Sequence, residues 1–236
     1  SIRLVGSEMC IRDSMHAIQA IAAMQRGINV YVQKPLTHNI REARMLTEMA
    51  RENKIVTQMG NQGASNSGMT KVQEWFNDGK IGTVDEVFVW TNRPVWPQGI
   101  PVPKPTGSSS PDHLDWDLWL GTAPFIPYSD AYHPFNWRGW WAYGTGALGD
   151  MGCHIIDVPF KTLGLHYPTA VECSVGQVFI NMWDPEYIPE GCPPSSSVTL
   201  DFSATEKNNS SLKMRWLDGG LRPPHPDLIP ANDSLG

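Results

Sequence analysis

Three polar side chains at helical spacing form the clearest candidate for chemistry in this sequence. Asp150, His154 and Asp157 stand at positions i, i+4 and i+7, so on an α-helix they share one face. A carboxylate beside an imidazole raises the pKa of the histidine and sets its tautomer. This arrangement suits a general base that takes a hydroxyl proton while hydride leaves the adjacent carbon. One alternative is a solvated helix face. Another is that Asp150 and His154 are two ligands of a metal ion, but the sequence offers no third ligand of suitable spacing.

Two further polar residues follow predicted strands. Lys34 comes just after a strand predicted over Ile28–Val32, and Asn61 comes just after one predicted over Ile55–Met59. Because the carboxyl ends of parallel strands point at one ligand crevice, we expect both side chains to face the same site. A lone lysine after a strand is usually only exposed, but Pro35 here restricts Lys34 to extended backbone.

The elements that must position these residues alternate between helix and strand. Apolar residues at three- and four-residue steps predict a helix that starts at Met15 and stops at Gly27. A second amphipathic helix is predicted over Arg41–Glu52, with Thr37 as its N-cap. With the two strands between and after them, these helices indicate a parallel sheet with crossover helices.

The rest of the chain predicts a second, sheet-based α/β region. A helix over Met69–Asn77 and a strand over Val84–Thr91 lead into residues 92–144, where frequent prolines argue against regular elements. The next helix is predicted over Asp150–Leu163, and Pro159 should end or kink it. Later strands are predicted at Thr169–Val175, Ser197–Phe202 and Ser211–Trp216.

A glycine-rich run lies directly before the predicted helix that carries Asp150. Gly144 to Gly149 matches G-x-G-x-x-G, the pattern of a pyrophosphate-binding turn at a helix N-terminus. That motif requires a buried strand in front of it, whereas Trp137–Tyr143 is aromatic and interrupted by Gly139. We therefore favour a turn that lets backbone approach a ligand closely, and dinucleotide binding is the alternative.

Composition narrows the function further. The chain has 236 residues, a net charge of −6 and no basic run, which argues against nucleic acid and anionic membranes as partners. Its four cysteines lack metal-binding spacing and leave disulfides undecided. Five of the ten tryptophans fall within 26 residues, where flat rings either stack on sugars or pack in a core; they are Trp116, Trp119, Trp137, Trp140 and Trp141.

The first fourteen residues differ in pattern from the rest of the chain. The run from Leu4 to Ser14 resembles the translation of a transposon-type sequencing adapter, and no periodicity links it to the next helix. We interpret residues 1–14 as a non-native segment and exclude them from the fold prediction. The native N-terminus, with any export signal, is then expected to lie outside this chain, so the compartment stays open.

The motifs together resemble one family. Tyr31–Leu36 is similar to the V-x-E-K-P-[LI] motif of the glucose–fructose oxidoreductase and inositol dehydrogenase (Gfo/Idh/MocA) superfamily, although Gln33 replaces the usual Glu. Gly144–Asp157 resembles the glycine-rich segment that leads into the D-x-x-x-H dyad of that family. Landmarks of a bacterial branch are matched by Gly60–Gly63, Gly79–Gly82 and Trp137–Trp141.

The resemblance implies an α/β fold in two parts and an oxidoreductase activity. Residues 15–66 would be part of a Rossmann-like parallel domain, and residues 67–236 part of an α/β domain with a large open, mostly antiparallel sheet through which copies can pair. The implied reaction transfers a hydride between NAD or NADP and a secondary alcohol of a sugar, polyol or glycoside. An NAD-dependent glycoside hydrolase and a non-catalytic sugar-binding protein are the alternatives.

Individual roles are also implied by the resemblance. The catalytic residues are Lys34, Asp150 and His154, with His154 as the acid/base, Asp150 as its partner and Lys34 at the substrate hydroxyl beside the nicotinamide. The cofactor contacts are Lys34, Pro35, Asn61 and Gln62. The substrate contacts are Arg138, Trp141 and Asp157. No metal ligand is implied.

The amino-terminal G-x-G-x-x-G of the family and its ribose-binding acid are absent from this sequence. Because those elements bind the phosphates and ribose, we expect the polypeptide as written to be inactive by itself and to bind NAD(P) weakly. Calorimetric titration of NAD⁺ and NADP⁺ into the purified chain should give almost no binding heat. A micromolar dissociation constant for either dinucleotide would contradict this prediction.

Overall fold

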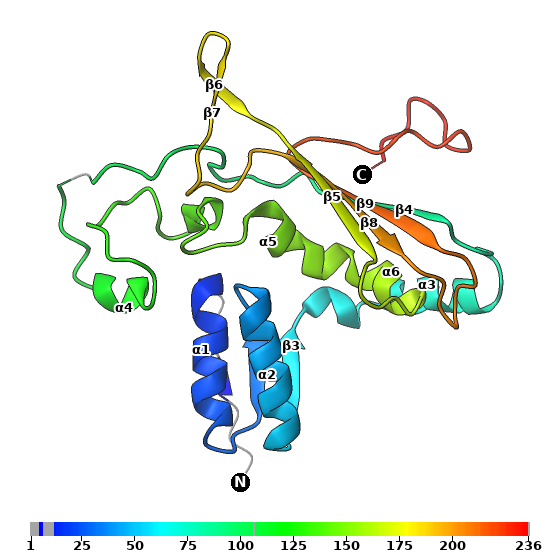
Figure 1. Cartoon of the computed structure of the whole chain (residues 1–236), viewed down its shortest axis with the longest axis horizontal. Helices are drawn as coiled ribbons and strands as arrows, with labels where there is room; N and C mark the ends of the chain where they lie inside the picture. Colours follow the sequence, from blue (N-terminus) through cyan, green and yellow to red (C-terminus); the bar gives the residue numbers. More distant parts are fainter. Residues whose placement is uncertain (1–4, 7–11, 106, 236) are drawn as a thin grey trace.

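The computed structural model describes residues 5–6, 12–105 and 107–235. The chain has the outline of a stem below a crossbar (Figure 1). The stem holds the amino-terminal helices and strands as far as residue 60, and the crossbar holds a larger sheet, its helices and the long connecting loops. The two parts meet where strands of the stem end beneath a helix of the crossbar.

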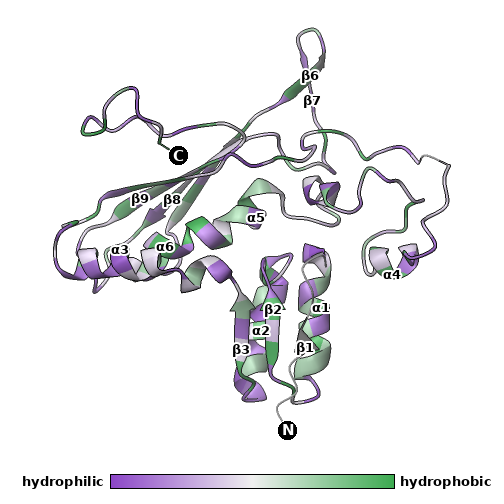
Figure 2. Ribbon diagram, turned by 180° about the vertical axis from the view of Figure 1, so that it is seen from behind, coloured by the Kyte–Doolittle hydropathy of each residue, from purple (hydrophilic) through white to green (hydrophobic). Residues whose placement is uncertain are grey.

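The stem is a parallel sheet of order β1-β2-β3, with β1 at Val5–Gly6, β2 at Val30–Gln33 and β3 at Thr57–Gly60. Helix α1 (Asp13–Met24) connects β1 to β2, and α2 (Ile40–Glu52) connects β2 to β3. Both helices lie on the same face of the sheet (Figures 1 and 2). The predicted Rossmann-like arrangement of parallel strands and crossover helices is therefore confirmed.

The side chains of β2 show why this sheet packs on one face. Val30 and Val32 are buried among the apolar residues of α1 and α2, whereas Tyr31 between them is 41% exposed on the other face. This is the alternation expected of a strand with one covered face. Gly27 has φ +71°, the left-handed conformation that ends α1 where the glycine predicted it.

Helix α2 is capped by Asn39, so the prediction of Thr37 as its N-cap is wrong. The Asn39 side chain accepts a hydrogen bond from the backbone N–H of Glu42 at 3.0 Å. The Glu42 carboxylate in turn accepts from the backbone N–H of His38 at 2.8 Å. The Thr37 hydroxyl instead donates to the carbonyl of Asn39, and Thr37 lies two residues before the observed cap.

The crossbar sheet has the order β4-β9-β8-β5 and is mostly antiparallel, as the family resemblance implies. Strands β5, β8 and β9 pair antiparallel, and β4 pairs with β9 in parallel. All four predicted strands are present, with bounds shifted by no more than two residues: β4 Glu86–Trp90, β5 Ala170–Val175, β8 Ser196–Phe202 and β9 Leu212–Leu217.

Three helices cover one face of this sheet and form its hydrophobic core: α3 (Ser67–Asn77), α5 (Gly146–Ile155) and α6 (Asp157–Thr162). The helix predicted over Asp150–Leu163 is thus two helices that meet at Ile156. Pro159 explains the break, because it has no N–H to donate to the carbonyl of Ile155. The predicted effect of this proline is confirmed.

Residues 92–144 run as a long connection around one end of the crossbar (Figure 1). The expectation that they contain no regular element is wrong at two short segments, α4 (Trp116–Leu120) and the 3-10 turn η2 (Asn136–Gly139). Both segments are free of proline, and Asp115 caps α4 by accepting from the N–H of Leu118 at 3.0 Å. In α4, local capping therefore outweighed the composition of the surrounding loop.

A hairpin that was not predicted projects from the crossbar (Figure 1). It consists of β6 (Val178–Asn181) and β7 (Asp184–Glu186), which pair antiparallel. Both strands are short, and Pro185 lies within β7, where a proline argues against a strand on sequence grounds.

Part of the segment interpreted as adapter-derived belongs to the packed structure. Residues 1–4 and 7–11 lie outside the described residues. Arg12 donates to the carbonyl of Leu120 at 2.8 Å, and the carboxylate of Asp13 accepts from the hydroxyl of Thr145 at 2.6 Å. That residues 1–14 are foreign to the protein remains a prediction.

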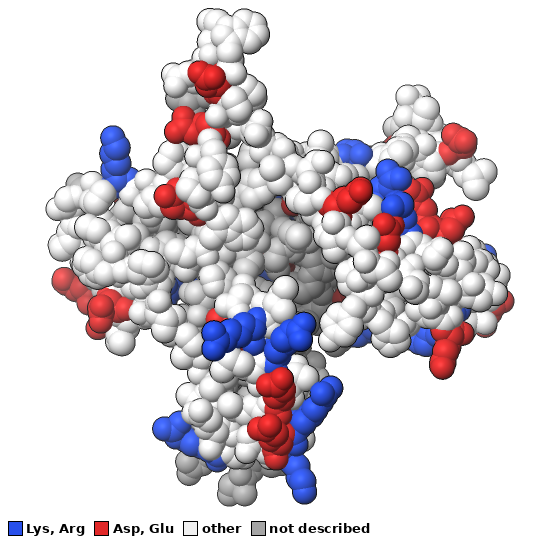
Figure 3. Space-filling model, in the orientation of Figure 1, with Lys and Arg blue, Asp and Glu red and all other residues white. Residues whose placement is uncertain are grey.

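Among the cysteines that the structure describes, Cys153, Cys173 and Cys192 are free thiols. Within the described ranges, no helix has the length and apolar character needed to cross a membrane. Figure 3 shows both positive and negative side chains on one face of the molecule; on the stem, adjoining positive side chains lie directly beside negative ones.

A buried carboxylate connects the ends of β8 and β9. Asp218 is 2% exposed and accepts hydrogen bonds from the Ser196 backbone N–H, the Ser196 hydroxyl and the indole N–H of Trp216. In Asp218→Asn an amide N–H faces one of these donors, so we expect the free energy of unfolding to fall by about 2–4 kcal/mol. Urea denaturation measures this loss.

Asp201→Asn is the matched control for this substitution. Asp201 pairs with Lys213 at 2.6 Å, but both side chains are well exposed, at 39% and 42%. An exposed pair contributes at most about 1 kcal/mol. Equal losses in the two variants would contradict a special role for the buried carboxylate.

Candidate functional site

An ion pair joins the stem to the crossbar at the predicted site. Lys34, directly after β2, donates from Nζ to Oδ1 of Asp150 at 2.7 Å and to the Asp150 backbone carbonyl at 2.8 Å. The two side chains are only 19% and 12% exposed. Arg138 of η2 approaches the same carboxylate oxygen, with its Nε at 3.4 Å. The carboxylate of Asp150 thus holds two cations, of which Lys34 is the nearer.

A second contact joins the next strand end to the same helix. Asn61 follows β3 and is 6% exposed. Its Oδ1 lies 2.5 Å from Nδ1 of His154, and its Nδ2 donates to the carbonyl of Cys153 at 2.5 Å. The structure therefore brings together Lys34 and Asn61 at neighbouring strand ends, as predicted, and places both against α5.

The predicted pairing of Asp150 with His154 differs from the observed contacts. Among the hydrogen bonds of these two described side chains, none joins one to the other. Asp150 engages Lys34 and Arg138, and His154 engages Asn61. The predicted stripe is also broken, because Asp157 begins α6 and pairs with Lys161 at 3.1 Å.

The electrostatics of His154 follow from these neighbours. Burial lowers the pKa of His154, the positive charge of Lys34 lowers it further, and the carboxylates of Asp150 and Asp157 offset only part of this effect. The sequence-based expectation of a raised histidine pKa is therefore wrong. Since the ordinary histidine pKa is about 6.5, His154 is mainly neutral at pH 7 and can accept a proton.

A cavity of about 390 Å³ opens beside the ion pair, at the carboxyl ends of β2 and β3. Lys34, Gln62, Arg138 and Asp150 line it, whereas His154, Asp157 and Trp141 are not among its lining residues. The site therefore has a positive ammonium and a glutamine amide next to an open volume. The carboxyl ends of parallel strands are where such sheets bind ligands.

One polar atom beside the cavity, on His16 of α1, lacks a partner among the described atoms. Nδ1 of His16 lies 2.6 Å from the carbonyl of Pro35, so that nitrogen must carry a hydrogen. The other ring nitrogen of His16, Nε2, is buried and has no hydrogen-bond partner among the described atoms. His16 also lines the cavity, so a polar group of a bound cofactor that reached Nε2 would give this covered atom a partner.

The glycine-rich turn has a packing role. Among the described elements, the one directly before it is the 3-10 turn η2 and not a strand, and α5 begins within it at Gly146, so the context of a pyrophosphate-binding turn is missing. A Cβ on Gly144 would lie 2.5 Å from the Cα of Arg138. Glycine at this position therefore allows the turn to pack on the backbone of η2, which carries Arg138.

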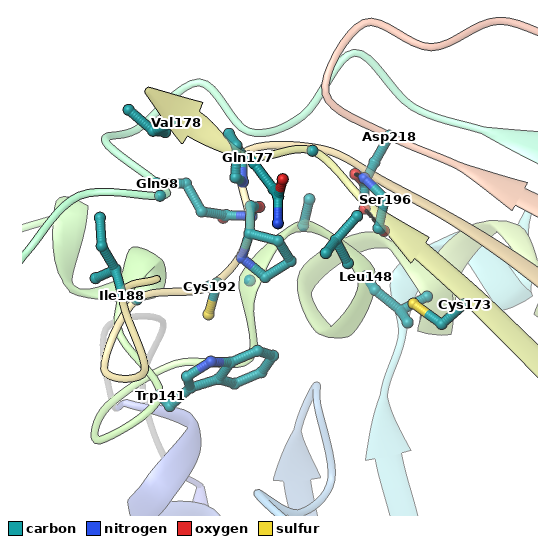
Figure 4. Close-up of a pocket in the computed structure, with 18 of the residues that line it drawn as sticks. Gln98, Trp141, Leu148, Cys173, Gln177, Val178, Ile188, Cys192, Ser196 and Asp218 are labelled. Atoms are coloured by element: carbon teal, nitrogen blue, oxygen red, sulfur yellow. Dashed lines mark hydrogen bonds between the residues drawn. The ribbon is translucent and has the colours of Figure 1, made fainter. Parts of the chain in front are cut away.

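Most of the clustered tryptophans form a core. Trp116, Trp137 and Trp140 are 8% exposed or less, and Trp119 stacks on Trp116 with ring centroids 4.5 Å apart. Trp141 differs, because it is 44% exposed and lines a separate apolar cavity of about 340 Å³. This cavity lies on the side of α5 away from the stem (Figure 4).

Sequence reasoning missed His16 and the carbonyl of Cys153. The histidine lies inside a predicted helix without a polar stripe, and a backbone carbonyl has no residue signature. Of the predicted cofactor residues, Gln62 lines the cavity and Pro35 contacts His16 through its carbonyl. Asn61 contacts His154 instead, and its side chain is directed at α5.

Two family models match the sequence. Residues 8–61 match the NAD-binding Rossmann fold of the Gfo/Idh/MocA oxidoreductase family, and residues 88–177 match a C-terminal alpha/beta domain of that family. These ranges fall in the stem and in the crossbar, respectively. Among curated protein sequences, none matches the chain.

Solved structures share the fold. GenD2 from gentamicin A biosynthesis, in complex with NAD, has a TM-score of 0.58 at 20% identity, over 91% of this chain and 46% of its own. WlbA dehydrogenase from Bordetella pertussis, in complex with NADH and UDP-GlcNAcA, has a TM-score of 0.56 at 14% identity, over 90% of this chain and 47% of its own. An NAD binding oxidoreductase from Klebsiella pneumoniae has a TM-score of 0.54 at 20% identity, over 90% of this chain and 46% of its own. The chain thus spans less than half the length of these proteins.

The charges around His154 predict opposite shifts of its pKa in two variants. Lys34→Met removes a positive charge that lowers the pKa, so the pKa of His154 should rise above that of the unmodified chain. Asp157→Asn removes a negative charge that raises it, so the pKa should fall. Titration of the imidazole signals by NMR measures both shifts.

Lys71→Met serves as the control for charge removal, because the contacts of Lys71, an ion pair with Glu74 and a cation–π contact with Trp75, both lie at exposed positions. It should leave the titration of His154 unchanged. Shifts of the same sign in Lys34→Met and Asp157→Asn would show that the assigned causes are incorrect.

Proposed function

Because the chain belongs to the Gfo/Idh/MocA family of NAD-binding oxidoreductases, we propose that it carries the proton-transfer part of a sugar or polyol oxidoreductase. The proposed reaction is reversible hydride transfer between NAD(P) and a secondary alcohol carbon of a sugar, polyol or glycoside. The observation that carries this proposal is the cluster of Lys34, Asp150 and His154 at the carboxyl ends of the stem strands. The ammonium group lies 2.7 Å from the carboxylate in that cluster.

His154 is the proposed acid/base. Burial and the charge of Lys34 keep its pKa below the ordinary value, so the neutral imidazole is available at pH 7 to accept the substrate hydroxyl proton. In the reverse direction the imidazolium returns the proton to the carbonyl oxygen. NAD(P), when bound, supplies the hydride acceptor and donor.

Lys34 is the proposed ligand of the reacting oxygen. Its ammonium group can hold the hydroxyl in the ground state and stabilise negative charge that develops on the oxygen as the proton leaves. Asp150 holds Lys34 by two hydrogen bonds, through its carboxylate and its carbonyl. Arg138 donates from Nε to the same carboxylate oxygen at 3.4 Å.

Two observations support a carbohydrate substrate. The solved WlbA dehydrogenase holds NADH together with UDP-GlcNAcA, a sugar nucleotide. The cavity beside Lys34 is lined by side chains that are able to form hydrogen bonds with hydroxyl groups, namely Gln62, Arg138 and Asp150.

We extend the proposal to pairing of two copies through the crossbar sheet, since every residue of β5 is exposed.

Replacement of His154 tests the catalytic role. In the whole protein, His154→Gln should lower kcat/KM for hydride transfer by about 10²–10⁴, the usual contribution of a general acid/base. The assay is NAD(P)H formation with a panel of sugars, polyols and glycosides. His166→Gln, at an exposed histidine after α6, is the matched control and should keep full activity.

The same assay separates the alternatives. Net NAD(P)H formation identifies a dehydrogenase, and glycoside release without it identifies a hydrolase that oxidises its substrate only transiently. Sugar binding without either product indicates a binding protein. Full turnover by His154→Gln would refute the proposed role of this histidine.

A further inference from the structure

We propose that Asn61 is a positioning residue that holds His154 as the Nδ1–H tautomer and thereby leaves Nε2 as the atom that exchanges the proton. The contacts of Asn61 alone determine which tautomer is assigned to His154. The use of Nε2 in catalysis also rests on the proposed function of His154. The resemblance placed Asn61 at the cofactor, so this assigns the residue a different task.

The backbone of Asn61 is fixed before its side chain acts. Its N–H donates to the carbonyl of Met59 at 2.9 Å, and its own carbonyl accepts from the N–H of Ala64 at 3.0 Å. The residue stands between β3 and the 3-10 turn η1 (Gln62–Ser65) and is 6% exposed. The side chain therefore starts from a defined point and reaches α5 without competition from solvent.

The carbonyl of Cys153 sets the orientation of the Asn61 amide. A backbone carbonyl can only accept a hydrogen bond, and it lies 2.5 Å from Nδ2 of Asn61. A flipped amide would place Oδ1 of Asn61 2.5 Å from the carbonyl oxygen of Cys153. Two oxygen atoms with no hydrogen between them would then repel each other. The amide nitrogen must therefore face Cys153, which leaves Oδ1 toward His154.

The orientation of the amide in turn sets the tautomer of His154. Oδ1 of Asn61 can only accept, and it lies 2.5 Å from Nδ1 of His154. Nδ1 must therefore carry a hydrogen in both the neutral and the protonated ring. In the neutral ring the lone pair is then on Nε2, and titration of His154 occurs at Nε2.

Adjacent residues of one helix receive both ends of the amide. Cys153 offers its carbonyl and His154 its ring nitrogen, so a single asparagine connects the strand end to consecutive positions of α5. An aspartate in its place could accept from His154 but could not donate to Cys153. It would also add a negative charge beside the imidazole. The asparagine orients the ring as a neutral acceptor.

The charged groups that face His154 are Lys34 directly after β2, Asp150 from its own helix and Asp157 from α6. With burial, their combined effect lowers the pKa of the imidazole. A neutral partner at Nδ1 preserves this low pKa, whereas a carboxylate there would raise it. Orientation of the ring and availability of its neutral form are thus compatible.

The test is nitrogen NMR of the purified chain labelled with ¹⁵N-histidine. The chain has seven histidines, and loss of one signal set in His154→Gln assigns His154. In the neutral form, Nδ1 should show the shift of a protonated nitrogen and Nε2 that of an unprotonated one. Asn61→Leu removes both hydrogen bonds at similar volume and should convert His154 largely to the Nε2–H form that free imidazole side chains prefer.

Two further variants complete the experiment. Asn61→Asp keeps an acceptor at Nδ1, so it should retain the Nδ1–H form and raise the pKa of His154 by about 1–2 units. Asn77→Leu makes the matched change at an exposed position at the end of α3 and should alter neither the tautomer nor the pKa of His154. In the whole protein, Asn61→Leu should lower kcat and displace the acidic limb of its pH profile, with little change of KM for the cofactor.

An Nε2–H form or an even mixture in the unmodified chain would overturn the proposal, as would an unchanged tautomer in Asn61→Leu. If Asn61→Leu does not fold, the unmodified chain and Asn61→Asp still decide between these results. An Nδ1–H tautomer combined with full turnover by His154→Gln would refute the proposed function and leave the role of Asn61 in orienting the ring intact.

Discussion

The structure of the site depends on the contact between Lys34 and Asp150. Lys34 directly follows β2 of the stem. Asp150 lies on helix α5 of the crossbar, 116 residues later in the chain. Neither charge is well exposed, so each compensates the burial of the other. Removal of one partner would leave the other charge buried without compensation, a cost of several kcal/mol in typical cases. The pair therefore fixes both the position of the ammonium group and the approach of the two parts.

The Asn61 contacts add a second constraint at the neighbouring strand end. Because β2 and β3 are parallel and adjacent, their carboxyl ends meet α5 side by side. Lys34 contacts Asp150, and Asn61 contacts Cys153 and His154, about one turn further along the helix. Two strand ends and one helix thus suffice to place an ammonium, a carboxylate and an oriented imidazole together. The parallel sheet is the physical reason that the site lies at this edge.

The sequence was most informative where local physics decides the structure. Apolar periodicity and the terminal Gly27 predicted the first helix. Sequence patterns also predicted β2, β3 and the four strands of the crossbar sheet within about two residues, whereas β1 lies in the excluded residues 1–14. Pro159 predicted the break between α5 and α6 for a simple covalent reason, its missing N–H. Pattern reasoning failed for α4 and for the β6–β7 hairpin. A capping aspartate in the first case, and cross-strand pairing around Pro185 in the second, outweighed composition.

By itself, the sequence determined which side chains could meet: Lys34 and Asn61 after adjacent strands, and Asp150 and His154 one helical turn apart. Those placements follow from repeat distances of strands and helices, which are local properties. Only the tertiary structure decided the partners. Asp150 binds Lys34, His154 binds Asn61, and the pKa of the histidine falls where sequence reasoning expected a rise. Hydrogen bonding and burial depend on distances between residues far apart in the chain, and spacing along the sequence does not contain those distances.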